Sequence, residues 1–102
     1  MRESVIEKHL VKRVKELGGE VRKVQWIGRR GAPDRLVMLP VRSVRESDTL
    51  VYNGFSKTIW VELKATGEVP EPHQEREHAR MRAMGQRVEV IDSIEGVERL
   101  LQ

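Results

Sequence analysis

The sequence contains no cysteine, and this absence excludes several classes of protein. Without cysteine the chain has no disulfide framework, no thiol nucleophile and no cysteine-based zinc site. Disulfide-free chains are suited to reducing compartments. The composition is therefore compatible with a protein that works inside the cell.

Long apolar runs are missing as well. No stretch approaches the roughly 18 apolar residues of a membrane-spanning helix, and the N-terminus turns polar at once with Arg2, Glu3 and Ser4. The chain also carries no internal repeat and no low-complexity tract. We therefore expect a soluble, cytoplasmic protein without a membrane partner.

Charge, in contrast, is abundant. Hydrophobic residues make up 38% and charged residues 34% of the 102 residues, a balance typical of a modest core beneath a heavily charged surface. A chain of this length has room for one core, so we expect a single domain over residues 1–102. The net charge of +3 permits nucleic-acid binding without demonstrating it.

Hydrophobic periodicity indicates helices and strands in alternation. Apolar residues recur at helical spacing up to Gly18-Gly19, and a second helix is bounded by prolines and Gly85. Alternating or short apolar runs indicate strands, and Ser93 is a candidate cap for a last short helix. The expected helices span residues 3–17, 70–84 and 93–101, and the expected strands span 20–26, 34–39, 58–64 and 87–91.

The polar segment 41–57 contains Asn53-Gly54, a strong turn signal that predicts a long hairpin between two antiparallel strands. The resulting order is helix, three strands with the hairpin among them, helix, strand and helix. This order predicts an α/β fold in which helices flank a mixed sheet.

Two charged residues lie on a strand that otherwise has a buried composition. Glu62 and Lys64 are two positions apart, so their side chains share one face of the strand. Burying both charges is costly unless they pair with each other or bind something. The pair is therefore either a structural ion pair or part of a functional site.

Asp34 follows Pro33 at the start of another strand, where it is either a turn former or a carboxylate aimed at its neighbour. Two carboxylates on adjacent strands, Asp34 and Glu62, can hold Mg²⁺, and the backbone carbonyl of Leu63 can contribute. A bound metal supplies an activated water and charge relief for phosphodiester cleavage. Lys64 could orient that water or stabilise the transition state.

Basic residues crowd the stretch around Asp34. Arg29 and Arg30 fall on the expected loop at residues 28–33, where they could engage phosphates at the rim of the site. With Lys23 and Arg35 they are the candidate DNA-binding residues. The alternative is that these side chains form an ordinary solvated face.

Other side chains near these motifs have simpler interpretations. Trp26 could stack on an unpaired base, but a core position is favoured for it. His73 and His78 are 78 − 73 = 5 positions apart, which fits poorly with a helical zinc pair, so we assign no zinc site.

The spacing of the charged motifs resembles a known pattern. Pro33-Asp34 is followed after 62 − 34 = 28 positions by Glu62-Leu63-Lys64, which resembles the PD-(D/E)xK nuclease signature. With Glu3 in an opening helix, Gly31-Ala32 before the first motif and Gln74 in a following helix, the chain resembles the VRR-NUC (virus-type replication-repair nuclease) family over essentially its full length.

This resemblance implies a restriction-endonuclease-like core, dependence on Mg²⁺ or Mn²⁺, and cleavage of branched or otherwise structured DNA. Small stand-alone members of the family, often phage-encoded, are homodimers that resemble Holliday-junction resolvases. Carried over to this chain, the resemblance makes Asp34 and Glu62 the metal-binding acids, Lys64 the catalytic lysine and Gln74 a supporting polar residue. Without the resemblance, Gln74 would be interpreted as an exposed helix residue.

The acid that the family carries in its first helix corresponds to Glu3 or Glu7. At about 100° per residue, Glu3 lies within about 20° of Leu10 on the helical wheel and is expected along the buried stripe, whereas Glu7 lies about 60° away. We favour Glu3 as the catalytic and metal-binding acid and retain Glu7. The alternative for Glu3 is an acid that interacts favourably with the helix dipole.

These observations predict a metal-dependent, structure-selective endonuclease that acts on branched DNA such as a four-way junction. A homodimer is expected because one short protomer offers a single site. One alternative is a catalytically idle DNA-binding or adaptor module, against which the retention of Asp34, Glu62 and Lys64 argues. Another is a restriction-type nuclease that reads duplex sequence with segment 41–57, which the short chain disfavours.

Overall fold

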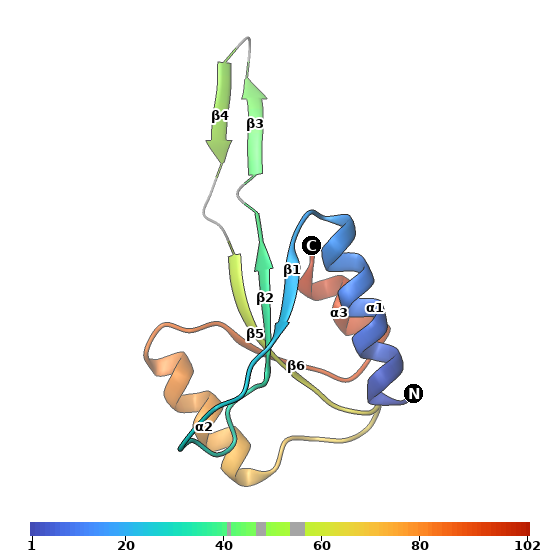
Figure 1. Cartoon of the computed structure of the whole chain (residues 1–102), viewed down its shortest axis with the longest axis vertical. Helices are drawn as coiled ribbons and strands as arrows, with labels where there is room; N and C mark the ends of the chain where they lie inside the picture. The colour runs from blue at the N-terminus through green and yellow to red at the C-terminus, as the bar shows by residue number, and fades with distance from the viewer. Residues whose placement is uncertain (41, 47–48, 54–56) are drawn as a thin grey trace.

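The computed structural model of the chain describes residues 1–40, 42–46, 49–53 and 57–102. Its elements alternate between helices and strands, which confirms the α/β class (Figure 1). In chain order they are α1 (Glu3–Glu16), β1 (Glu20–Lys23), β2 (Arg35–Leu39), β3 (Arg42–Glu46), β4 (Thr49–Asn53), β5 (Lys57–Leu63), α2 (Pro72–Ala83), β6 (Val88–Ile91) and α3 (Ile94–Leu100).

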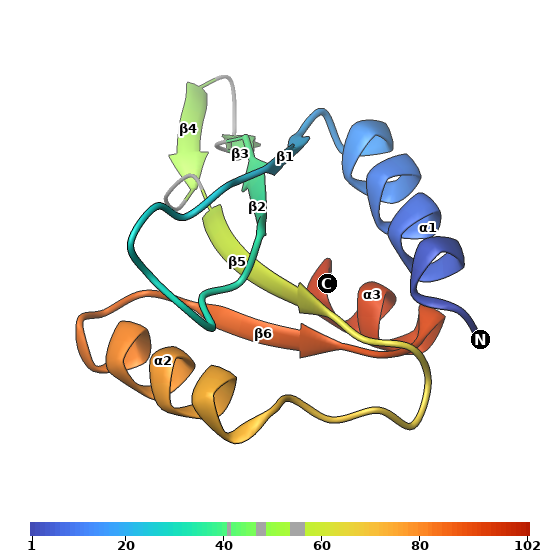
Figure 2. The same ribbon diagram turned by 60° about the horizontal axis from the view of Figure 1, so that its bottom comes forward.

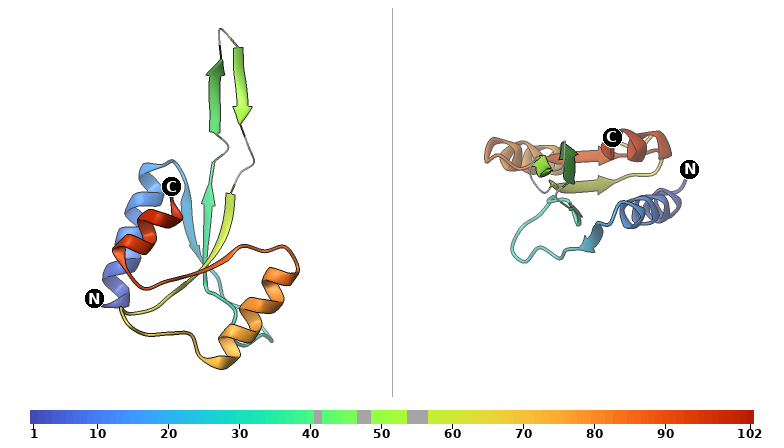
Figure 3. Two further views of the ribbon diagram at one scale, coloured as in Figure 1. Left: turned by 180° about the vertical axis from the view of Figure 1, so that it is seen from behind. Right: turned by 90° about the horizontal axis from the view of Figure 1, so that it is seen from above.

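Four of the strands form a mixed sheet in the order β1-β2-β5-β6. The pairs β1–β2 and β2–β5 are antiparallel, and β5 pairs with β6 in parallel through the crossover that contains α2. Helices α1 and α3 lie on one side of this sheet, and α2 lies on the other, as does the loop before β2 (Figure 2; Figure 3). The expected mixed sheet flanked by helices is therefore confirmed.

The main core fills the space between the sheet and the two helices α1 and α3. Alternate residues of β5 are buried there, because successive side chains of a strand point to opposite faces. Trp60 and Glu62, which alternate with these core residues, consequently face the α2 side. The core-facing residues of β5 are Ile59, Val61 and Leu63, and those of α1 are Ile6, Leu10 and Val14.

Strands β3 and β4 pair only with each other within the described residues, in a separate two-stranded sheet that confirms the predicted hairpin. The hairpin extends from the four-stranded sheet along the longest axis of the molecule (Figure 1). No helix in the described part of the chain is long and apolar enough to span a bilayer.

The turn of this hairpin was predicted at the wrong place. Glu46 pairs with Thr49 at one end of the hairpin and Arg42 pairs with Asn53 at the other, so Asn53 lies within β4, and Gly54 lies outside the described residues. Strand pairing explains the difference. Because Leu39 is paired with Lys57 in the main sheet, the two halves of the intervening segment can pair fully only if the chain reverses near its middle.

Candidate active site

Strand register brings the two acids of the sequence motif together. Arg35, the first residue of β2, is paired with Val61 of β5. One position further along this antiparallel pair, Asp34 lies beside Glu62. The backbone N–H of Val24 donates to the Asp34 carbonyl at 2.9 Å, which holds the backbone of Asp34 in place. The exposed fractions of the two side chains differ, at 49% for Asp34 and 11% for Glu62.

The surroundings of Glu62 favour the neutral form of its carboxyl group. Burial and the neighbouring Asp34 carboxylate raise the pKa of Glu62 from 4.5 to about 7. Lys64 acts in the opposite direction, whereas Glu3 raises the pKa further. A cation bound between the two carboxylates would stabilise their charged forms. Strong perturbation of this kind is typical of functional sites.

Gln74 connects the lysine and the buried acid of the motif. The side-chain oxygen of Gln74 accepts hydrogen bonds from Lys64 Nζ at 2.9 Å and from the backbone N–H of Glu71 at 2.8 Å. Its amide nitrogen donates to Glu62 Oε1 at 3.2 Å. Since both donors meet the oxygen and the acceptor meets the nitrogen, the amide orientation is fixed. Gln74 thus caps α2 and holds Lys64 and Glu62 in one network.

His78 lies at the site although its sequence position did not predict this, since it was weighed there only as a zinc ligand. The side chain of His78 is 1% exposed, and its Nε2 atom lies 3.8 Å from Glu62 Oε1. Among the residues that the structure describes, this nitrogen has no hydrogen-bond partner. Burial and the nearby Arg82 lower the pKa of His78, which favours the neutral ring. The available signal was the spacing of four residues from Gln74, which places both on one helix face.

The two acids of α1 are placed differently from the prediction. Glu3 is exposed rather than turned along the buried stripe, because it is the first residue of α1 and the packed stripe starts one turn later at Ile6. It is nevertheless close enough to raise the pKa of Glu62. Glu7 is half-buried and accepts a hydrogen bond from Arg35 Nη2 at 2.8 Å. Glu3 therefore remains a candidate for the metal site, and Glu7 has a structural partner.

The prediction that Arg35 binds DNA is wrong. Its side chain is 8% exposed, and its guanidinium group pairs with Glu7 at 2.8 Å and with Asp34 Oδ1 at 2.9 Å. Arg35 lies on the core face of β2 because it alternates with residues that point toward α2. It links Glu7 of α1 to Asp34 and helps to orient the Asp34 side chain.

The donor set formed by Asp34 and Glu62 fits a magnesium or manganese ion. Carboxylate and carbonyl oxygens are the ligands that these ions prefer, and Mg²⁺ commonly keeps several waters. Within the described residues there is no group of three or more acidic or histidine side chains that could hold a metal. Asp34 and Glu62, with the Leu63 carbonyl between Glu62 and Lys64, are therefore the candidate metal ligands.

Residues 25–33, here called the rim loop, connect β1 to Asp34 and are anchored at several points. Trp26 Nε1 donates to the Pro33 carbonyl at 2.8 Å. The Trp26 ring packs on Trp60 at a centroid distance of 5.1 Å, but Trp26 is half-buried and lies outside the main core in which it was predicted. Arg29 Nε donates to Glu77 Oε2 at 2.9 Å, which ties the rim loop to α2.

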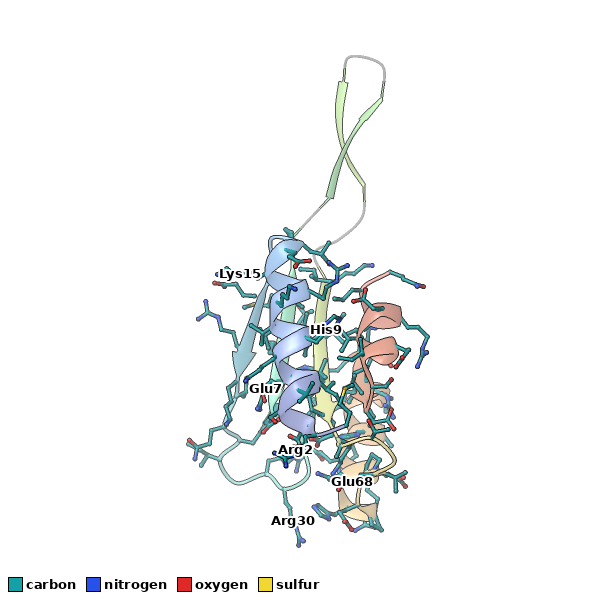
Figure 4. All side chains as sticks on the ribbon, turned by 90° about the vertical axis from the view of Figure 1, so that its right-hand side faces the viewer. Arg2, Glu7, His9, Lys15, Arg30 and Glu68 are labelled. Atoms are coloured by element: carbon teal, nitrogen blue, oxygen red, sulfur yellow. The ribbon has the colours of Figure 1, made fainter. Side chains whose placement is uncertain are left out.

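The Arg29 contact is more than a surface ion pair, because the Glu77 side chain is only 3% exposed. Burial alone would raise the pKa of Glu77, but Arg80 and Arg29 outweigh it and lower that pKa. Arg30 and Lys23 are exposed, and Figure 4 shows Arg30 pointing away from the body at the end opposite the hairpin. These two residues, and the exposed half of Arg29, remain available to bind phosphate.

Gly31 packs so closely on α2 that a larger residue should disturb the site. Its φ is +87°, and an added Cβ would lie 2.8 Å from the His73 carbonyl oxygen. Gly28 in the same rim loop has a φ of +71° but nothing within 4 Å. We expect Gly28→Ala to cost about 1 kcal/mol through backbone strain alone, and Gly31→Ala to cost about 2–3 kcal/mol.

Urea unfolding of the two glycine variants measures this difference directly. Only Gly31→Ala should also weaken metal binding, because it pushes the loop that carries Asp34 away from α2. Equal loss of stability in both variants would show that the close contact with His73 is unimportant.

The fold and the site together define a nuclease with a restriction-endonuclease-like core, and comparisons with known proteins agree. A solved structure described as "VRR_NUC domain" matches with a TM-score of 0.73 and 37% identity, over 97% of this chain and 92% of that chain. The protein named "Putative nuclease p44" from Acyrthosiphon pisum secondary endosymbiont phage 1 is 50% identical over 93 residues, which span 91% of this chain and 85% of the phage protein. No family model matches the chain. The chain belongs to the VRR-NUC family of nucleases.

Proposed function

We propose that the protein is a metal-dependent endonuclease that hydrolyses phosphodiester bonds in branched DNA and acts as a homodimer. The observation that carries this proposal is the convergence of Asp34, Glu62 and Lys64 at one end of the main sheet, with Gln74 bonded to both Glu62 and Lys64. The raised pKa of Glu62 supports a cation at this place.

Each residue of the site has a distinct role in the proposed reaction. Asp34 and Glu62 hold Mg²⁺ or Mn²⁺ through carboxylate oxygens, with the Leu63 carbonyl as a further donor and Glu3 acting from the N-terminus of α1. When bound, the ion polarises the phosphate and lowers the pKa of a coordinated water. Lys64, held by Gln74 at 2.9 Å, orients the attacking water or stabilises the charge that develops on the phosphate.

The preference for branched DNA rests on the family resemblance, whereas DNA binding itself is supported by the basic residues on and beside the rim loop. Asp34 directly follows this loop, and the exposed Arg30 and Lys23 lie on the loop and at the end of β1. Basic side chains beside a phosphodiester-cleaving site bind the DNA backbone irrespective of sequence. Each protomer has one such site, so paired cuts across a junction require two protomers.

The proposal is tested by incubating the purified protein with a labelled four-way junction and a matched linear duplex. Each substrate is offered with Mg²⁺, with Mn²⁺ and with EDTA, and the molar mass in solution is measured by light scattering. We expect cutting of the junction that needs metal, much weaker cutting of the duplex, and the mass of a dimer.

Other outcomes would favour the alternatives. Binding of the junction without cutting under any metal condition would indicate a catalytically idle adaptor. Efficient cutting of the duplex at one defined sequence would indicate a restriction-type enzyme. Cutting that persists in EDTA would contradict the proposed dependence on a metal ion.

A further inference from the structure

Ile27, near the tip of the rim loop, is the most unusual apolar residue of the surface. It is 95% exposed, more than any other large hydrophobic residue that the structure describes. Single exposed apolar residues are common and need no explanation by themselves. Ile27 differs because the residues on both sides of it are held firmly, so that its exposure is not the result of a loose chain end.

The rim loop is anchored both before and after Ile27. Trp26, the preceding residue, is fixed by its hydrogen bond to Pro33 and by its contact with Trp60. Arg29, two residues later, is bonded to the buried Glu77. Between them Gly28 adopts a φ of +71°, which directs the chain through a tight bend. The loop therefore presents Ile27 on a fixed support.

The position of Ile27 relative to the candidate active site defines what it can touch. The backbone N–H of Val24 donates to the Asp34 carbonyl at 2.9 Å, and Ile27 follows Val24 by three residues. Three residues of extended chain span at most about 10 Å, and bases along one strand are about 3.4 Å apart. The backbone of Ile27 therefore lies within a few base steps of Asp34.

The charge around Ile27 favours DNA over an apolar protein partner. Arg29 and Arg30 follow it in the loop, and Lys23 lies on the strand that leads into it. A fully exposed isoleucine among basic side chains matches the wedges that several DNA-binding proteins insert between base steps, where they unstack bases and kink the duplex. Basic residues then hold the flanking phosphates.

We propose that Ile27 is a wedge that inserts between bases beside the scissile phosphate and makes the enzyme select DNA that is already unstacked. This inference rests on the proposed nuclease function and names the residue that determines its preference for branched substrates. Insertion costs less where stacking is already interrupted, as at a junction, than in continuous duplex. Ile27 thus converts a general DNA-binding loop into one that recognises branch points.

The test places the fluorescent base 2-aminopurine at successive positions across the branch point of a four-way junction, and at matched positions in a linear duplex. All variants are made in the Lys64→Ala background so that the DNA stays intact. We expect binding to raise the fluorescence at a branch-point step, and Ile27→Ala to abolish this rise and to weaken junction binding about tenfold. Affinity for the duplex should change little.

Two control variants separate the wedge from other contributions. Met84→Ala removes another exposed apolar side chain, 68% exposed just after α2, and should change neither the fluorescence nor the affinity. Arg30→Ala should weaken junction and duplex binding alike, because a phosphate contact carries no preference for branching. The slope of the logarithm of the binding constant against the logarithm of the salt concentration should become shallower by about one.

Two results would overturn the proposal that Ile27 is a wedge. One is an Ile27→Ala variant with unchanged fluorescence and unchanged junction affinity. The other is a change of molar mass in Ile27→Asp without DNA, which would show that Ile27 contacts a second copy of the chain. Both leave the nuclease assignment intact if the wild-type protein cuts junctions with metal, whereas a wild type that cuts no DNA defeats the nuclease assignment itself.

Discussion

Lys64→Ala will lower the rate of junction cleavage by about a hundredfold to a thousandfold, while binding of the junction is retained. The reason is that Lys64 supplies a positive group beside Glu62, which is a proposed metal ligand, and lies outside the main core. Its Nζ atom bonds to Gln74 Oε1, which keeps its second partner, the backbone N–H of Glu71, after the substitution. Single-turnover cleavage with saturating metal measures the chemical step.

Lys57→Ala is the matched control for this experiment. Lys57 begins the same strand, is exposed, and lies at the end of β5 away from Glu62. We expect this variant to cut at the wild-type rate and both variants to unfold in urea at similar concentrations. If Lys64→Ala cleaved as fast as Lys57→Ala, Lys64 would have no place in the catalytic site.

Glu62→Gln will abolish metal-dependent cleavage and, without metal, stabilise the protein at alkaline pH. The folded-state pKa of Glu62 is raised from 4.5 to about 7, so the native state holds its proton more tightly than the unfolded chain. Wild-type stability therefore falls as the pH rises from about 4.5 to 7 and stays reduced above that. The full difference corresponds to about 3 kcal/mol at most.

The measurement is urea unfolding of wild type and Glu62→Gln in EDTA between pH 4 and pH 8. The variant should match the wild type near pH 4, where Glu62 is protonated in the folded and the unfolded state, and should be more stable by about 2–3 kcal/mol at pH 8. Added Mg²⁺ should stabilise the wild type and leave the variant unchanged. Glu68→Gln, on an exposed loop, should reproduce the wild type throughout. A variant less stable than wild type at pH 8 would contradict the raised pKa.

The fold was largely predictable because most elements have strong local signals. The stripe of α1, the alternation of β5 and the Ser93 cap of α3 all appear as expected, and Ser93 Oγ accepts from the backbone N–H of Gly96 at 2.9 Å. The turn of the hairpin was misplaced because its position depends on the pairing of Leu39 with Lys57, which is not a local property of the sequence.

The candidate site was predictable only in part. The motif spacing led to Asp34, Glu62 and Lys64, the family resemblance added Gln74, and the structure brings these residues together. The placement of the other charged residues depends on burial. Whether a charged side chain is buried with partners or exposed depends on contacts between distant segments, so the burial of Arg35, the exposure of Glu3 and the approach of His78 to Glu62 could not be deduced from periodicity.

The pairing of Leu39 with Lys57 also gives the molecule two parts that can evolve separately. These two residues are paired on the neighbouring strands β2 and β5, so the segment between them leaves the main sheet and returns to it at the same place. Its length can change without shifting the register of β2 against β5, on which Asp34 and Glu62 depend. Residues could therefore be added to or removed from this hairpin while the relative position of Asp34 and Glu62 stays the same.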